Sequence, residues 1–261
     1  MEKLLIAPKA ALDKINDFMN LPLGGKNVTC PYFMNKRKQR AGLRVLIGKG
    51  DPEDIVTEVR VWAKVKHFNL FKASTIEVRN FMLNRDIGSD CSGFVVHILN
   101  AWLKVQKAGQ LIKYLHFQDN GLFTRVRRWL RPVENIGADL LTGPLNTNII
   151  EDLDSIQPGD LIRSKGLERN AHHLLLIIKV VKVAERVKSF SYVHSTRNYW
   201  LNNGVRKGKV EIININKGLK DQKWLEVEDG ENYTLKGLLN NYQDNGLRRL
   251  KWINLDYQVA N

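Results

Sequence analysis

The run HHLLLIIKVVKV, residues 172–183, is the stretch of sequence that decides the fold. It is short, apolar and rich in β-branched residues, which is typical of a buried strand. It follows Pro158-Gly159, after which the pattern of the chain changes to strands. We expect strands at residues 160–164, 173–183, 190–195 and 209–216, with one more at 250–257.

The first half of the chain carries helical patterns instead. Residues 9–20 place apolar side chains at helical spacing, and residues 51–54 combine a capping aspartate, a proline and acids in the order that opens a helix. Residues 74–77 form a capping-box pattern, and residues 88–90 open a further helix with an apolar inner face. Helices followed by consecutive strands predict an α+β fold with N-terminal helices packed on a central antiparallel sheet.

Composition limits the class of protein. The 261 residues are enough to bury a core, and 41 Lys and Arg against 27 Asp and Glu give a net charge of +14. Such a surplus favours anionic partners, namely nucleic acid, anionic lipid head groups or anionic cell-wall polymers, although a solvated basic surface has the same composition. The only two cysteines, Cys30 and Cys91, exclude a disulfide scaffold.

No stretch of the sequence predicts a membrane span or a signal peptide. The N-terminal segment lacks an apolar core of signal-peptide length, and the longest apolar stretch, 174–183, is interrupted by Lys179 and Lys182. We therefore expect a cytoplasmic protein, with export by another route left open.

Two segments are rich in basic residues. Residues 35–44 predict a solvated loop or a flexible arm. In residues 122–130 the apolar side chains fall on one face of a helix, with arginines around it. We interpret this segment as a covering helix with its basic side in water, and contact with an anionic ligand is the alternative.

The motif DCSGF, residues 90–94, is the sharpest chemical feature. It puts Cys91 in the first turn of the predicted helix, where free N–H groups and the helix dipole favour a thiolate. The same N–H groups could hold an oxyanion. A small buried cysteine at a helix start is the alternative interpretation.

A nucleophilic thiol needs a base and a group that orients this base. His172 and His173 head one predicted strand and His194 lies on the next, so a hairpin would bring His173 and His194 together. Adjacent strand residues point to opposite faces, so only one of His172 and His173 can reach Cys91. The alternative is surface histidines at a strand edge. No metal-ligand pattern stands out, because the cysteines are far apart and HExxH is absent.

Three motifs together resemble the NlpC-type cell-wall cysteine peptidases, relatives of papain with a rearranged strand order. DCSGF is similar to the family's nucleophile motif DCSGLV, and QPGDLI (157–162) with HHLLLII is similar to its PGDLVFF and HVGIYLG strands. YVHS (192–195) resembles the strand that supplies the orienting residue. The resemblance implies a papain-like fold with Cys91 as nucleophile, His173 as base and His194 as orienting residue, with His172 as the alternative base.

The chain departs from this family in three places. The family's tyrosine before the cysteine has its nearest counterpart in Tyr32, which could support an oxyanion if residues 35–88 are an insertion. Leu175 replaces the glycine after the base, and the gap from Cys91 to Pro158 is long. We expect one papain-like domain over 1–261, with an N-terminal helix and basic loop region (1–50), an insertion (104–154) and a C-terminal strand extension (209–261).

The resemblance implies a cysteine hydrolase that cleaves an amide in peptidoglycan stem peptides, or a related γ-glutamyl or D-amino-acid amide, through a thioester and without a cofactor. Peptidoglycan or another anionic wall polymer is then the expected partner. An acyltransferase or deamidase on the same fold is one alternative. A basic nucleic-acid-binding protein without catalysis is another, and salt-dependent binding that Cys91→Ala leaves unchanged would favour it.

Overall fold

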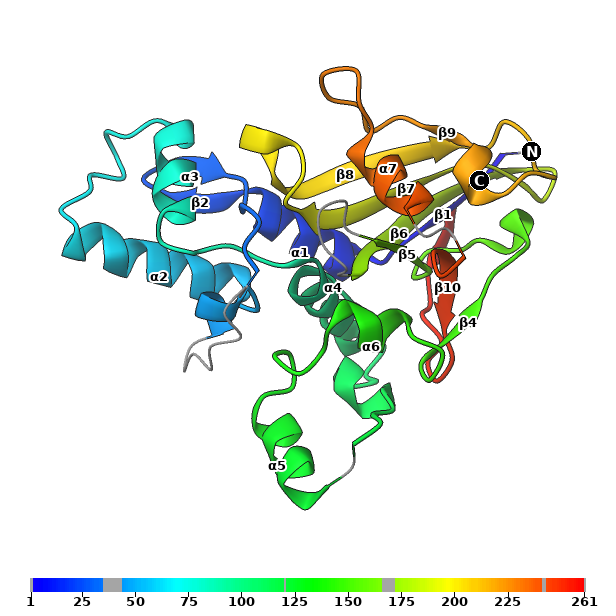
Figure 1. Cartoon of the computed structure of the whole chain (residues 1–261), viewed down its shortest axis with the longest axis horizontal. Helices are drawn as coiled ribbons and strands as arrows, with labels where there is room; N and C mark the ends of the chain where they lie inside the picture. Colours follow the sequence, from blue (N-terminus) through cyan, green and yellow to red (C-terminus); the bar gives the residue numbers. More distant parts are fainter. Residues whose placement is uncertain (1, 35–43, 120, 166–171, 241–242, 261) are drawn as a thin grey trace.

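The computed structural model describes residues 2–34, 44–119, 121–165, 172–240 and 243–260 (Figure 1). The helices of this part of the chain are α1 (Lys9–Met19), α2 (Pro52–Val65), α3 (Thr75–Leu83), α4 (Cys91–Val105), α5 (Leu122–Leu130), α6 (Ala138–Thr142) and α7 (Tyr233–Leu239). The strands are β1 (Glu2–Ile6), β2 (Leu21–Leu23), β3 (Lys26–Val28), β4 (Thr147–Ile149), β5 (Leu161–Lys165), β6 (His172–Val183), β7 (Arg186–Thr196), β8 (Gly204–Glu211), β9 (Lys223–Trp224), β10 (Gly246–Leu250) and β11 (Gln258–Ala260).

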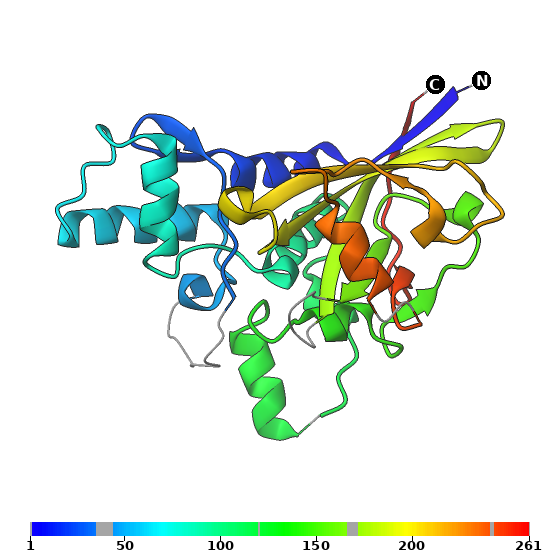
Figure 2. The same cartoon turned by 45° about the horizontal axis from the view of Figure 1, so that its top comes forward.

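One large antiparallel sheet organises the molecule. Its strands follow the order β4-β10-β5-β6-β7-β8-β9, and every pairing between them is antiparallel. The second half of β6 also pairs with β1, and β11 pairs with the far side of β1. The two ends of the chain therefore lie side by side (Figure 2). The predicted α+β class and the antiparallel sheet are confirmed.

Both faces of the sheet are buried, which explains why β6 reads as a continuous apolar run. Leu174 and Leu176 belong to a core that also contains the apolar side chains of α1 and α4. Leu175 and Ile177 point the other way, into a second core beneath α7. Alternate residues of a strand face opposite sides, so a strand covered on both sides needs apolar residues at every position.

The predicted helix starts are confirmed by their caps. Asp51 accepts a hydrogen bond from the backbone N–H of Asp54 at the start of α2. At α3 the hydroxyl of Ser74 and the carboxylate of Glu77 form both hydrogen bonds of a capping box. Such caps satisfy N–H groups that a helix cannot pair internally, which is why these short patterns are readable from sequence.

Several predicted strand positions are wrong. The strand expected at 209–216 is β8, Gly204–Glu211, and residues 212–216 leave the sheet. Residues 251–257, expected as a strand, connect β10 to β11 without strand structure. Both errors follow from reading apolar residues as strand positions where the chain is held by tertiary contacts instead, such as the bond from Trp102 Nε1 to the carbonyl of Asp256.

The N-terminal region contains more strand than expected. β1 precedes α1, and β2 and β3 form a separate hairpin in the turn-rich segment after α1. Of the basic run at 35–44, only Arg44, in a short 3-10 turn, lies within the described residues. Helices α2 and α3 stand beside the β2–β3 hairpin, away from the large sheet (Figures 1 and 2).

Candidate active site

Asp90 caps α4 and thereby fixes Cys91 in its first turn. The Asp90 carboxylate accepts from the backbone N–H of Gly93 at 2.6 Å and from the hydroxyl of Ser92 at 3.0 Å. Gly93 has no room for a side chain, because an added Cβ would lie 2.6 Å from the carbonyl oxygen of Gly48. The backbone of Gly48 therefore lies close to Gly93, in the space that a side chain at this position would need.

Lys49 is a functional residue that the sequence did not reveal. Its ammonium is buried beside α4, where it bonds to the Asp90 carboxylate at 3.0 Å, to the Ser92 hydroxyl and to the carbonyl of Ile136. The carbonyl of Lys49 in turn contacts Nε2 of the buried His97 at 2.9 Å. A buried cation next to the candidate nucleophile favours anions there.

The expectation that Cys91 is a ready thiolate is wrong. Burial raises the pKa of the Cys91 thiol to about 12, and the neighbouring Asp90 carboxylate adds to this rise. Lys49 and backbone hydrogen bonds from Leu174 and Ser92 oppose the rise without overcoming it. The cost of desolvating the thiolate thus outweighs its stabilisation by the helix N-terminus, so the resting group is a neutral thiol.

Cys91 lies at the end of the sheet where β6 and β7 separate. The last pair that joins these strands is Leu176 with Val193, although both strands continue beyond it. The Cys91 sulfur has a backbone hydrogen bond from Leu174, and the carbonyl of Ser89 accepts from the Ser195 hydroxyl at 2.7 Å. The start of α4 is thereby attached to both strands beside His173 and His194.

His173, His194 and Glu226 form a chain of hydrogen bonds. Nε2 of His173 lies 2.8 Å from Nδ1 of His194, and Nε2 of His194 lies 2.9 Å from the Glu226 carboxylate. His194 is fully buried. Burial, with a contribution from His194, lowers the pKa of His173 to about 3, so this imidazole is neutral.

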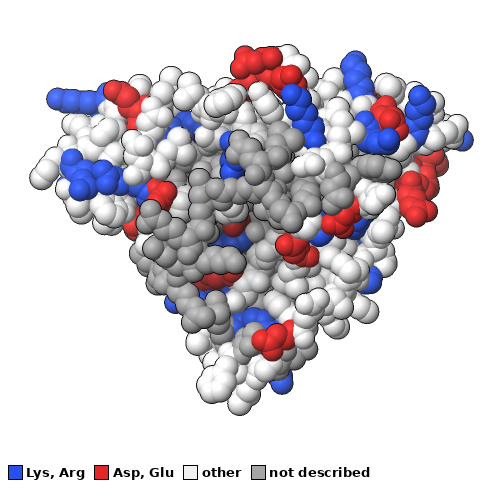
Figure 3. Space-filling model, viewed as in Figure 1, with Lys and Arg blue, Asp and Glu red and all other residues white. Residues whose placement is uncertain are grey.

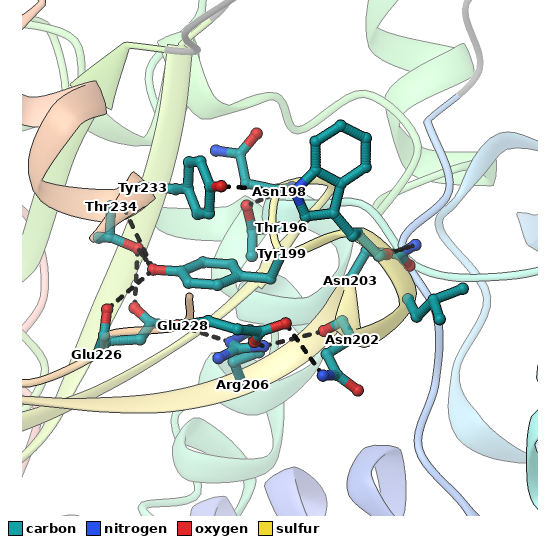
Figure 4. Close-up of polar contacts among 12 residues, drawn as sticks. Thr196, Asn198, Tyr199, Asn202, Asn203, Arg206, Glu226, Glu228, Tyr233 and Thr234 are labelled. Atoms are coloured by element: carbon teal, nitrogen blue, oxygen red, sulfur yellow. Dashed lines mark hydrogen bonds and ion pairs between the residues drawn. The ribbon is translucent and has the colours of Figure 1, made fainter. Parts of the chain in front are cut away.

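Glu226 is the second functional residue that the sequence did not reveal. Besides His194 it accepts from the Tyr192 hydroxyl at 2.7 Å, from the Thr234 hydroxyl at 2.8 Å and from Nε of Arg206 at 2.9 Å. Figure 4 shows Glu226 with Thr234 and Arg206. Burial alone would raise its pKa, but the charge of His194 and these hydrogen bonds together lower the pKa to about 2. Glu226 therefore holds a permanent negative charge at the far end of the histidine chain.

A second layer of contacts holds this carboxylate in place. The guanidinium of Arg206 stacks on the Tyr199 ring at 3.8 Å and also pairs with Glu228 at 2.8 Å. The Tyr199 hydroxyl contacts both Thr234 and the backbone carbonyl of Glu226 (Figure 4). Arg206 lies in β8 and Thr234 in α7, whereas Tyr199 follows β7, so tertiary packing determines where the carboxylate lies.

His172 is engaged elsewhere. Strand alternation places it on the face of Leu174, which α4 covers, and direction alone would assign it to Cys91. However, Nδ1 of His172 meets the carboxylate of Asp139, and Nε2 lies 2.9 Å from Asp244 and 2.8 Å from Arg163. Both ring nitrogens are thus occupied by an ion-pair cluster, whereas Nδ1 of His173 has no hydrogen bond to any described residue.

The structure also brings Tyr32 to this end of the sheet. Tyr32 and Ser89 form a parallel β-bridge, and the backbone N–H of Tyr32 donates to the side chain of Asn203. Tyr32 is therefore paired with Ser89, which lies two positions before Cys91, although Tyr32 itself lies 59 positions before Cys91 in the sequence. The intervening chain, which includes α2 and α3, leaves this region and returns to it (Figure 1).

No protein-family model, no curated protein and no solved structure matches the chain. Among the described residues, no group of three or more His, Cys, Asp or Glu side chains is arranged to hold a metal ion. The function proposed below therefore depends on the thiol and the histidine chain.

Proposed function

We propose that this protein is a cysteine hydrolase of papain-like fold that cleaves an amide bond, with Cys91 as nucleophile and His173 as base. The single observation that carries the proposal is the chain of hydrogen bonds from His173 through His194 to Glu226, in a protein that also places a thiol at the N-terminus of α4. A buried structural cysteine needs no such chain. The order of the motifs DCSGF, QPGDLI and YVHS supports the NlpC-type family.

The proposed mechanism uses one arrangement of the ring protons. The Glu226 carboxylate can only accept, so Nε2 of His194 carries a proton, and we propose that Nδ1 of His194 carries none when the enzyme is ready to react. Nδ1 of His194 then accepts from Nε2–H of His173. The remaining nitrogen of His173, Nδ1, is left with a free lone pair, which is the form that a general base requires.

The resting state determines the type of catalysis. The pKa of Cys91 is raised to about 12 and that of His173 is lowered to about 3, so the pair is a thiol and a neutral imidazole. We therefore propose that the thiol proton moves to Nδ1 of His173 as the sulfur attacks the substrate carbonyl carbon. The imidazolium that forms is stabilised through His194 by the negative charge of Glu226.

The rest of the reaction uses the same groups in reverse. His173 gives its proton to the leaving amine, and the C–N bond breaks to leave a thioester on Cys91. His173 then takes a proton from water, which attacks the thioester and releases the acid and the free thiol. The first-turn N–H groups of α4 and the neighbouring Tyr32 are the candidate donors to the oxyanion.

The proposed substrate is an amide in peptidoglycan stem peptides or a related γ-glutamyl or D-amino-acid amide. The test is digestion of purified peptidoglycan, followed by identification of the released fragments by mass spectrometry. Fragments with one new amine and one new carboxyl group support hydrolysis at an amide. Intact peptidoglycan after prolonged incubation would exclude this substrate class.

A further inference from the structure

Helix α5 turns its apolar side chains to the outside, which is the reverse of the usual orientation of a surface helix. Leu122, Phe123, Val126, Trp129 and Leu130 are all exposed, with exposed fractions from 50% to 92%, whereas Arg128 is buried. The sequence interpretation of a covering helix with its basic side in water is therefore wrong. The helix projects from the body of the molecule at the lower edge of Figures 1 and 2.

The contacts of Arg128 explain this orientation. Its guanidinium lies 4.2 Å from the centre of the Phe117 ring and donates to the carbonyl of Asp119. At about 100° per residue, Arg128 stands opposite Val126 and Phe123 on the helix. Fixing the arginine against the body therefore turns the apolar arc outward.

The apolar arc is continuous and carries aromatic residues. The five exposed side chains span roughly a third of the helix circumference, and four of them, with Arg131, line a shallow hollow. In Figure 3 uncharged atoms reach the lower tip of the molecule, with atoms of Lys or Arg and of Asp or Glu beside them. Such an exposed apolar patch marks a surface that a membrane or another molecule covers.

We propose that α5 docks on an anionic membrane surface. Residues 119–131 contain four arginines and one acid, Asp119, and the whole chain carries a net charge of +14. Exposed Arg125 lies at the margin of the apolar arc, where a side chain can reach lipid head groups while the aromatic residues enter the interface. None of the helices in the described part of the chain is long and apolar enough to cross a bilayer, so α5 would lie on the surface.

Other occupants fit α5 less well. Nucleic acid would be contacted by arginines, but Arg128 is turned inward and the outward face is apolar. A second copy would bring the same arginine-rich segments together, and like charges repel. The proposal does not depend on the hydrolase function, because it concerns binding alone.

The test is co-sedimentation of the full chain with vesicles of phosphatidylcholine, with or without phosphatidylglycerol, at several salt concentrations. We expect binding to the anionic vesicles only, weakening as salt increases. The double variant Phe123→Ser with Trp129→Ser keeps the net charge and should lower the partition coefficient by about tenfold or more, because both rings leave the interface. Arg125→Gln should lower it less.

A matched control separates apolar docking from general attraction of a basic protein. Phe71→Ser with Ile213→Ser removes two other exposed apolar side chains, 79% and 65% exposed, and should leave binding unchanged. Circular dichroism confirms that each variant is folded. Equal binding by the α5 double variant and the wild type would overturn the proposal, as would equal binding to neutral vesicles. A concentration-dependent dimer that the wild type forms and only the α5 double variant loses would also overturn the proposal.

Discussion

Glu226 accepts a hydrogen bond from Nε2 of His194 at 2.9 Å, and this contact orders the protons of the whole site. Because the carboxylate can only accept, Nε2 of His194 carries a proton. In the proposed mechanism Nδ1 of His194 then accepts from Nε2 of His173, so that Glu226 acts through His194 to leave Nδ1 of His173 as the base nitrogen.

Glu226→Gln should lower kcat by about 10²-fold or more with little change in KM, because the amide carries no charge to stabilise the imidazolium. Glu228→Gln is the matched control, since Glu228 contacts the same Arg206 but not His194, and it should keep most activity. Long-range ¹H–¹⁵N spectra should show the His173 ring protonated at Nε2 in the wild type and a mixture in Glu226→Gln. An unchanged tautomer and kcat in that variant would contradict the proposed role.

The two adjacent histidines should respond differently to substitution. His173→Ala should lower the rate by roughly 10²-fold to 10⁴-fold, as loss of a general base does, without a large change in melting temperature. His172→Ala should keep activity but lower the melting temperature slightly, because the contacts of His172 with Asp139 and Asp244 are lost while Arg163 still pairs with both. The measurements are steady-state kinetics and thermal unfolding, and the reverse pattern would make His172 the base.

The raised pKa of Cys91 predicts slow alkylation. Iodoacetamide should label Cys91 poorly near neutral pH and faster only as the solution becomes alkaline, because the thiolate is the reactive form. Asp90→Asn should speed the labelling, since asparagine still caps the helix while the charge that raises the pKa is gone. Labelling is followed by intact mass and peptide mapping. Complete labelling of Cys91 in mildly acidic solution would show that the thiolate already exists at rest.

Two buried histidines predict how stability depends on pH. The pKa of His173 is lowered to about 3 and burial also lowers that of His97, so the unfolded chain binds protons that the folded chain does not. Stability should therefore fall as pH drops from about 6.5 towards 3. Glu226, with its pKa lowered to about 2, adds to this loss only below about 4.5.

His97→Gln removes one of these titrations and should make the melting temperature less sensitive to pH between about 6.5 and 5. His116 is exposed, so His116→Gln should leave the slope unchanged. Thermal unfolding at a series of pH values measures both slopes. A steeper slope in His97→Gln would mean that the sign of the shift is wrong.

The sequence predicted those parts of the structure that short-range patterns encode. Residues 174–178, within the run at 172–183, are apolar at every position because both sheet faces are covered there. Motif order also pointed to His173 and His194, whose rings are joined by a hydrogen bond, and to Cys91 as the first residue of α4. The caps at Asp51 and Ser74 belong to the same class of local signals.

The remaining parts depend on contacts that no local pattern carries. Glu226 follows the two-residue strand β9 and reaches His194 only because β8 and α7 hold it there. Lys49 lies in a glycine turn 42 residues before Cys91 and becomes part of the site through tertiary packing. The inverted orientation of α5 accompanies the contacts of Arg128 with the Phe117 ring and the carbonyl of Asp119.

Cys91 is the nucleophile of the proposed reaction, so its substitution is the most direct test of the account. Purified peptidoglycan is digested with the wild type, with Cys91→Ser and with Cys30→Ser, and the fragments are measured by mass spectrometry over time. Cys30 is also buried, and its sulfur contacts the backbone of Pro31 and of Ser89, so Cys30→Ser controls for loss of a buried thiol. The account predicts amide-cleaved fragments from the wild type and Cys30→Ser and none from folded Cys91→Ser. Fragments released by Cys91→Ser at the wild-type rate would contradict it.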